Sequence, residues 1–136
     1  MQNKALVKIL AVDDETAILS SLRKVLVDTG CIVVTVESGA EGLAVLQHGR
    51  MFDVIISDYR MPGMNGIEFL AATCELQPDS FRILLTGVAP GKDIIASLKS
   101  GVISTHIPKP CDSDVLLAVV NNWIADNIRG KSYVYE

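Results

Sequence analysis

The sequence predicts an α/β domain in which parallel strands alternate with helices. Short β-branched runs fall near residues 7–12, 31–36, 53–57, 81–86 and 103–107, and amphipathic stretches fill the intervals near 15–28, 39–47, 66–76, 91–99 and 112–128. This alternation is typical of βα units on a parallel sheet. The composition agrees, because 49% hydrophobic and 21% charged residues indicate a folded chain, and 136 residues suffice for one domain.

Helix ends are marked by residues suited to capping. The first helix carries an apolar stripe at i, i+3 and i+4 spacing, made of Ile18, Leu19, Leu22, Val25 and Leu26. Gly30 follows it, where a left-handed cap is expected. Ser38 is placed to cap the start of the second helix, and Gly49 is placed to stop it.

The last predicted helix has a wide apolar surface. At 100° per residue its apolar side chains spread over roughly 220° of arc, and they are Val115, Leu116, Leu117, Val119, Val120, Trp123, Ile124 and Ile128. A helix packed on one face of a sheet needs only about 100°. We therefore expect part of this surface to lack a partner within the domain.

Several classes of protein are disfavoured by charge and cysteine content. The net charge of −4 and the absence of a basic stripe argue against nucleic-acid binding by this domain. Cys31, Cys74 and Cys111 are widely spaced, which disfavours a disulfide framework or a zinc site. Val115–Ala125 is shorter than the ~20 residues of a membrane span, and Met1–Lys8 lacks the core of a signal peptide. We expect a soluble cytoplasmic domain.

Polar residues follow four of the predicted strands, each where the apolar run stops. They are Asp13-Asp14, Asp58, Thr86 and Lys109-Pro110. The carboxyl ends of parallel strands lie at one edge of the sheet, which is where open α/β sheets bind ligands. The sequence therefore predicts that three carboxylates, a hydroxyl and an ammonium group converge there.

This combination suits phosphoryl transfer to a carboxylate. Carboxylate oxygens are ligands for Mg²⁺, which shares itself with phosphate, and an aspartate can itself accept a phosphoryl group. Lys109 would neutralise the transferred oxygens and Thr86 would donate a hydrogen bond. Taken singly, the acidic pair could cap a helix, Asp58 could be a turn residue and Lys109 a solvated charge. Their coincidence at one edge favours the phosphorylation site.

Four stretches carry a resemblance to a known family: ILAVDDE, VIISDYRMPGMNGIEFL, ILLTG and IPKP. From about Val7 to Ile128 the chain resembles the receiver domain of two-component response regulators. The resemblance implies a flavodoxin-like, doubly wound sheet of five parallel strands in order 2-1-3-4-5, with helices on both faces. Residues 1–129 would form this domain, and residues 130–136 a tail or the start of a linker.

The resemblance also implies a role for each matching residue. Asp58 would be the phosphoacceptor for a histidine kinase or phosphotransfer protein. Mg²⁺ would be bound by Asp13, Asp14 and Asp58, together with the backbone carbonyl of Arg60. The phosphoryl group would be met by Thr86 and Lys109, beside the small Gly87. Pro110 would follow a cis peptide bond. The chain would be a regulatory domain that assists its own phosphorylation and dephosphorylation, not an enzyme.

Two residues near this constellation raise further expectations. His106 stands where the family usually has Tyr or Phe, the aromatic residue that transmits the switch. It either fills the strand position or makes the switch sensitive to pH, since a free histidine titrates near about pH 6.5. The long side chain of Arg60 could overhang the phosphoryl group, and we expect it to slow attack by water.

The output of the switch is expected on the face built from the helix near 91–99, the last strand and the last helix. Val115 and Val119 would border an interface there, for a homodimer or for another partner. The chain carries no output domain of its own, so it is either a stand-alone regulator or the receiver part of a longer protein. An unphosphorylated interaction module is disfavoured by the intact site, and an aspartate-nucleophile phosphohydrolase by Arg60, where such enzymes place an acid.

Overall fold

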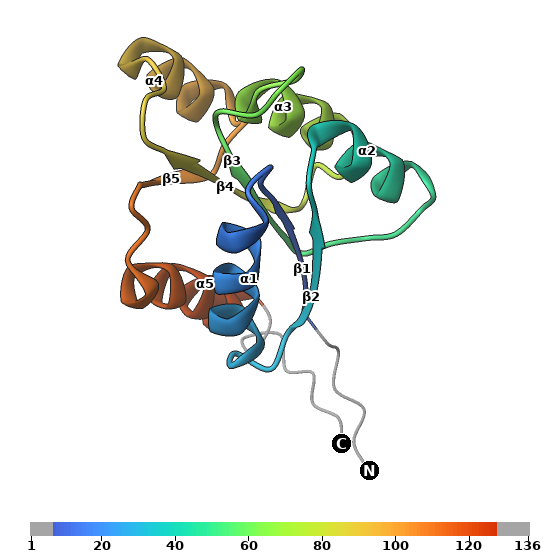
Figure 1. The fold of residues 1–136 in the computed structure, drawn as a ribbon. Coiled ribbons are helices and arrows are strands. Elements are labelled where there is room, and N and C mark those ends of the chain that lie inside the picture. The colour runs from blue at the N-terminus through green and yellow to red at the C-terminus, as the bar shows by residue number, and fades with distance from the viewer. Residues whose placement is uncertain (1–6, 128–136) are drawn as a thin grey trace.

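The computed structural model describes residues 7–127, which form five strands and five helices in strict alternation (Figure 1). The strands are β1 (Lys8–Val12), β2 (Ile32–Val36), β3 (Val54–Asp58), β4 (Phe81–Thr86) and β5 (Thr105–Pro108). The helices are α1 (Thr16–Val27), α2 (Gly39–Gln47), α3 (Gly66–Leu76), α4 (Gly91–Ser100) and α5 (Ser113–Asn127). Ile128 and the expected tail, 130–136, lie outside the described residues.

The strands form one parallel sheet in the order β2-β1-β3-β4-β5, which confirms the expected topology. β3 is central and every residue in it is buried, as its continuous apolar sequence predicts. β2 lies at one edge of the sheet, where the guanidinium of Arg23 donates to the Val33 carbonyl at 3.1 Å. This contact covers part of an otherwise unpaired strand edge.

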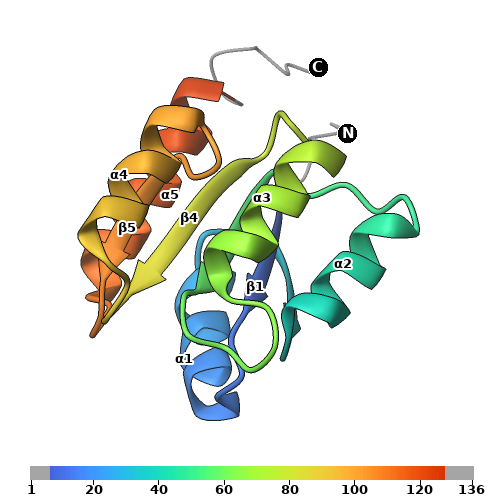
Figure 2. The same ribbon diagram turned by 90° about the horizontal axis from the view of Figure 1, so that it is seen from above.

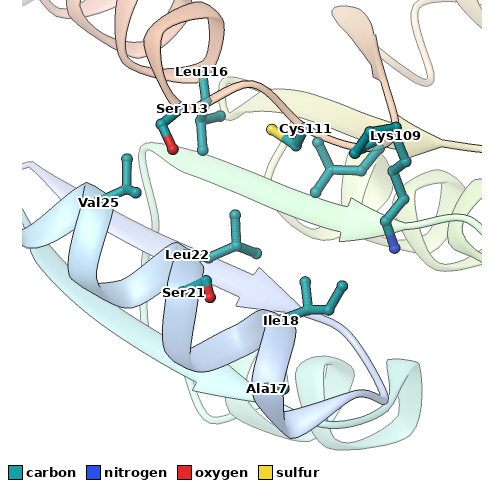
Figure 3. A pocket seen from close by; sticks show the side chains of 11 residues that line it. Ala17, Ile18, Ser21, Leu22, Val25, Lys109, Cys111, Ser113 and Leu116 are labelled. Atoms are coloured by element: carbon teal, nitrogen blue, oxygen red, sulfur yellow. The ribbon is translucent and has the colours of Figure 1, made fainter.

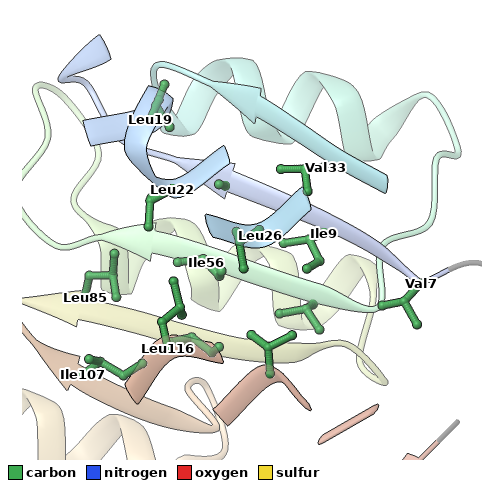
Figure 4. Packing of buried hydrophobic residues seen from close by; sticks show 14 of the residues in the cluster. Val7, Ile9, Leu19, Leu22, Leu26, Val33, Ile56, Leu85, Ile107 and Leu116 are labelled. Atoms are coloured by element: carbon green, nitrogen blue, oxygen red, sulfur yellow. The ribbon is translucent and has the colours of Figure 1, made fainter. Parts of the chain in front are cut away.

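Helices cover both faces of the sheet (Figures 1 and 2). α1 and α5 pack on one face, where Leu22, Leu26 and Leu116 meet Ile56 and other strand residues (Figure 4). α2 and α3 cover the opposite face, and α4 lies over its β5 side, with Ile94 packed against that second core. The two apolar layers hold the sheet rigid, so that residues at its carboxyl edge are presented from fixed positions.

Gly30 and Ser38 behave as the sequence predicts, and α3 has a further cap that was not predicted. Gly30 has a φ of 85°, in the left-handed region that a glycine adopts without steric cost. The Ser38 side chain accepts a hydrogen bond from the Glu41 N–H at 3.1 Å. α3 begins with a capping box, in which Asn65 and Glu68 each accept a 2.9 Å hydrogen bond from the other's backbone.

α5 leaves part of its apolar surface exposed, as its wide arc predicts. Leu116, Val120 and Ile124 are buried, and the Trp123 ring stacks on Phe81 with 6.0 Å between centroids. Val115 is the one large hydrophobic residue of Ser113–Asn127 that is exposed, at 45%. The wide arc is mostly absorbed because Trp123 packs at the side of the helix, against β4. Within residues 7–127, no helix is long and apolar enough to cross a membrane.

Candidate functional site

The carboxylates converge as predicted at the carboxyl edge of the sheet. Val12 pairs with Ser57 in the register of β1 and β3, so the next residues, Asp13 and Asp58, are neighbours. Asp13 and Asp58 are buried, whereas Asp14 is exposed. One oxygen from each of the three carboxylates lies within 4.8 Å of the others. The parallel topology thus turns two distant segments of sequence into one acidic cluster.

Lys109 joins this cluster from the end of β5. Its Nζ donates to Oδ1 of Asp58 at 3.1 Å and lies 3.6 Å from Oδ2 of Asp13. The Lys109 backbone N–H donates to the Thr86 carbonyl at 2.7 Å, which ties the ends of β4 and β5 together. The Lys109–Pro110 bond is cis, as the family resemblance implies. The ammonium group therefore spans the two buried carboxylates.

The proton affinities reflect this crowding. The pKa of Asp13 is raised, chiefly because burial disfavours its charge; the hydrogen bond from the Glu15 N–H opposes the rise, and repulsion from Asp58 adds to it. Burial alone would lower the pKa of Lys109, but the hydrogen bond to Asp58 and the attraction of Asp13 outweigh it, so that pKa is raised overall. The lysine is thus held in its charged form.

The site is open to ligands through a surface depression of about 520 Å³. Asp14, Asp58, Arg60, Gly87 and Lys109 are among its lining residues. A Cβ placed on Gly87 would have only the Lys109 Cβ within 4 Å, at 3.8 Å. The missing side chain of Gly87 therefore contributes to the opening above Asp58.

The donor set fits a hard divalent cation. Oδ1 of Asp13 accepts the Glu15 N–H at 2.9 Å, while Oδ2 is buried with no hydrogen-bond donor. Lys109 Nζ is 3.6 Å from Oδ2, too far for a hydrogen bond, so a bound cation would further compensate this buried charge. With Asp14 and Asp58, Asp13 offers oxygen ligands of the kind that Mg²⁺ binds, beside open space for water. Receiver domains use Mg²⁺ at such an acidic site.

The predicted switch residues lie around this centre. Thr86 ends β4, is 8% exposed, and pairs in register with Pro108 of β5. His106 is half-buried on β5, and its Nδ1 is buried without a hydrogen-bond partner. Val115 is exposed at the start of α5, and Val119 packs against the edge of the core under α1 and α5.

Gly66 is a site residue that sequence analysis did not single out. A Cβ on this first residue of α3 would lie 2.9 Å from the Asp58 carbonyl carbon and closer still to its oxygen. The Gly66 N–H donates to the Tyr59 carbonyl at 2.8 Å. α3 can support the backbone of Asp58 at this range only without a side chain. A glycine directly after the helix cap Asn65 was the available signal.

An apolar groove of about 330 Å³ lies beside the site, between α1 and α5 (Figure 3). Ile18 and Leu22 line it from α1, Leu116 from α5, and Cys111 from the loop between β5 and α5. Lys109 borders both this groove and the depression above Asp58. A macromolecule bound at the site would therefore meet apolar surface on this side.

Known proteins resemble the chain in sequence and fold. The family model described as the response regulator receiver domain matches residues 9–121. The transcriptional regulatory protein GlrR of Escherichia coli is 39% identical over 114 residues, which are 84% of this chain and 25% of GlrR. A 14.6 kDa protein of Leptolyngbya boryana is 33% identical over 90% of this chain and 94% of its own length.

Solved structures agree with the sequence comparison. A CheY-like receiver domain protein from Methanospirillum hungatei JF-1 superposes with a TM-score of 0.83 at 32% identity, covering 90% of this chain and 96% of that one. The chain spans about a quarter of the length of the first transcriptional regulators it matches. The match over residues 9–121, the 2-1-3-4-5 sheet and the carboxylate cluster with Lys109 agree: the chain belongs to the response regulator receiver domain family of two-component signal transduction.

Proposed function

We propose that Asp58 accepts a phosphoryl group from the phosphohistidine of a partner kinase or phosphotransfer protein. The observation that carries this proposal is the position of the Asp58 carboxylate, which is hydrogen-bonded to Lys109 and clustered with Asp13 and Asp14 beneath an open depression. A carboxylate oxygen forms the new P–O bond as the P–N bond breaks, and the leaving imidazole keeps the electron pair and is protonated by solvent.

The surrounding residues would stabilise the charge that moves in this step. Mg²⁺ held by Asp13, Asp14 and Asp58, with the backbone carbonyl of Arg60, would neutralise the phosphoryl oxygens. Lys109 Nζ lies 3.1 Å from Asp58 Oδ1, and after transfer it would donate to an oxygen of the phosphoryl group. The Arg60 side chain borders the depression, and we infer that it slows hydrolysis by limiting the approach of water.

We infer that the phosphoryl group draws Thr86 and Lys109 inward and so alters the face of α4, β5 and α5. Those two residues end adjacent strands and are joined by the Lys109 N–H bond to the Thr86 carbonyl. His106 lies on β5 within this face, and its buried Nδ1 has no hydrogen-bond partner, so it is free to gain one. A phosphoryl group adds nearly two negative charges, enough to rearrange such a network.

The same face would supply the output contact, to a second copy of the chain or to another partner. Ile95, Leu98 and Val115 are large hydrophobic residues exposed on α4 and α5, and Val119 lies one turn along from Val115. In a longer regulator such as the transcriptional relatives, this contact would pass the signal to an output domain. In a stand-alone regulator it would bind the target directly.

Intact mass spectrometry tests the phosphoacceptor directly. The chain is incubated with Mg²⁺ and acetyl phosphate, beside Asp58→Asn and a control, Asp79→Asn, at an exposed residue before β4. A labile adduct of one phosphoryl group is expected in the native chain and the control and not in Asp58→Asn. No adduct in the native chain would support an unphosphorylated interaction module, and rapid turnover of acetyl phosphate without an adduct would support a phosphohydrolase.

Sedimentation tests the interface. Val115→Lys and Val119→Lys are compared with Val27→Lys, whose 46% exposure at the end of α1 matches the 45% of Val115. With a phosphate mimic bound, the native chain and the control are expected to associate more strongly than the α5 variants. Equal association of all four proteins would remove Val115 and Val119 from the interface.

A further inference from the structure

Arg82 is a buried charge whose hydrogen bonds go to backbone carbonyls and one serine. It is the second residue of β4, it is 5% exposed, and no carboxylate of residues 7–127 lies within 4.0 Å of it. Nε donates to the Val102 carbonyl and Nη2 to the Gly101 carbonyl, both at 2.9 Å. Nη1 donates to the carbonyl and the hydroxyl of Ser80 at 2.9 and 3.0 Å.

These bonds join two loops at the amino edge of the sheet, opposite the phosphorylation site. One loop precedes β4 and contains Ser80, while the other leads from α4 to β5 and contains Gly101 and Val102. A planar guanidinium with five donors can hold both loops at once, which a lysine cannot do. The backbone of Arg82 adds to the link, since its N–H donates to Ser104 Oγ at 2.9 Å and its carbonyl accepts the Ser104 N–H at 2.8 Å.

The anchored element is the carboxyl end of α4. Gly101 caps this helix in the left-handed conformation, with a φ of 83°. Its carbonyl accepts from Arg82, so a positive charge lies at the negative end of the helix dipole. The Ile103 N–H donates back to the Ser97 carbonyl at 3.2 Å, and Ile103 is 1% exposed. This end of α4 is held by charge, hydrogen bonds and burial together.

The amino end of α4 packs on the second core through Ile94 but lacks the charged anchor of the other end. Its cap residue, Pro90, makes no side-chain capping bond, and Gly91 and Lys92 are exposed. Ser97, in the last turn, is the single fully buried residue of the helix. The loop Gly87–Pro90, exposed except for the half-buried Ala89, connects this end directly to Thr86 at the phosphorylation site. The carboxyl end of α4 is therefore held by more contacts than the amino end, and we expect it to open less readily.

We propose that Arg82 is the pivot of α4: it holds the carboxyl end of the helix against β4 and β5, so that movement of Thr86 displaces the amino end. This inference rests on the proposed function, because it requires a phosphoryl group to move Thr86. An unanchored α4 would shift or unwind as a whole, and the surface with Ile95 and Leu98 would lose a defined second position.

Residue-resolved amide exchange by NMR tests the pivot, with Mg²⁺ and beryllofluoride as the phosphate mimic. In the native chain, the mimic is expected to change exchange rates by about threefold or more from Gly87 to Ala96. The hydrogen-bonded amides of Gly101, Ile103 and Ser104 are expected to keep their rates. Equal changes at both ends of α4 would overturn the proposal without any variant.

Variants then separate anchoring from general stability. In Arg82→Met, exchange at Gly101, Ile103 and Ser104 is expected to rise about tenfold, and the response to the mimic should spread along all of α4. Arg23→Met is the control for loss of an arginine, because Arg23 also donates to a backbone carbonyl but does not touch α4. Two results would refute the anchoring role of Arg82: a uniform rise in exchange rate throughout the Arg82→Met chain, or no rise at these three amides. If Arg82→Met is unfolded, the same measurements on Arg82→Lys and on the native chain decide whether Arg82 is the pivot.

Calorimetry of beryllofluoride binding distinguishes the two levels of failure. If the native chain does not bind the mimic in the presence of Mg²⁺, both the proposed function and the pivot proposal are refuted. If the mimic binds and α4 responds evenly from end to end, the pivot alone is wrong. Binding with unequal responses at the two ends supports both.

Discussion

Gly66→Ala is expected to disrupt the support of Asp58, the proposed phosphoacceptor, from a position outside the carboxylate cluster. The added Cβ would lie 2.9 Å from the Asp58 carbonyl carbon and 2.9 Å from Leu84 Cδ1, and nearer still to the Asp58 carbonyl oxygen. Two of these three atoms belong to the backbone of β3, which is central and fully buried. The first turn of α3 must therefore move away from Asp58.

The cost can be estimated from the contacts that change. Forcing a methyl group into a packed interior costs typically about 1–3 kcal/mol. Loss of the 2.8 Å hydrogen bond from the Gly66 N–H to Tyr59 adds about 0.5–1.5 kcal/mol. Alanine also reduces the conformational entropy of the unfolded chain, which offsets this cost by about 0.4–1 kcal/mol. We expect the free energy of unfolding to fall by about 2–3 kcal/mol.

Urea unfolding followed by fluorescence of Trp123, the single tryptophan, measures this change. For a domain of this size the midpoint should fall by roughly 1–2 M. Gly91→Ala is the control, because Gly91 is likewise the first residue of a helix, α4, but a Cβ added there would meet no atom within 4 Å. It should be neutral or slightly stabilising. Equal midpoints for the two variants would refute the close-approach argument, and slower phosphorylation of Gly66→Ala by acetyl phosphate would extend it to function.

Three further outcomes are expected. Asp13→Asn should raise the free energy of unfolding of the metal-free protein at neutral pH, since it removes a buried charge whose pKa is raised in the fold. A lower free energy of unfolding for the variant, measured with a metal chelator present, would contradict this. Ionised Asp13 weakens the fold above its raised pKa, so the advantage of the variant should shrink as pH falls through that pKa, as paired urea titrations would show. Asn65→Ala should cost about 1 kcal/mol in the same assay through loss of the α3 cap, and a change below about 0.3 kcal/mol would deny the capping box a role in stability.

Much of the fold was readable because its signals are local. The β-branched runs, the amphipathic spacing and caps such as Ser38 depend on neighbouring residues, and the structure places helices and strands within two residues of the expected bounds. The family resemblance supplied the strand order, which periodicity alone does not contain. Asp13, Asp58 and Lys109 were expected to lie together because the carboxyl ends of parallel strands meet at one edge of the sheet, and the structure confirms this.

The extent of exposed surface on α5 could not be read from one element in isolation. The apolar arc predicted that part of this helix would lack a partner, and Val115 is the large hydrophobic residue of the helix that remains exposed within residues 7–127, while Trp123 stacks on Phe81 of β4. Helical projection does not record which strand residue lies opposite the helix. The roles of His106, Arg60 and Val119 stay predictions.

The sequence by itself determined an alternating α/β chain, helix caps such as Ser38, and the residues of the proposed magnesium-dependent phosphorylation site, since each follows from local pattern or from the parallel sheet. The tertiary structure decided which contacts position that site. The 3.1 Å bond from Lys109 to Asp58 joins residues 51 apart, Gly66 is needed because α3 approaches the Asp58 backbone, and Arg82 is buried because two loops offer it carbonyls. These are distances between segments remote in sequence, and packing of the whole chain sets them.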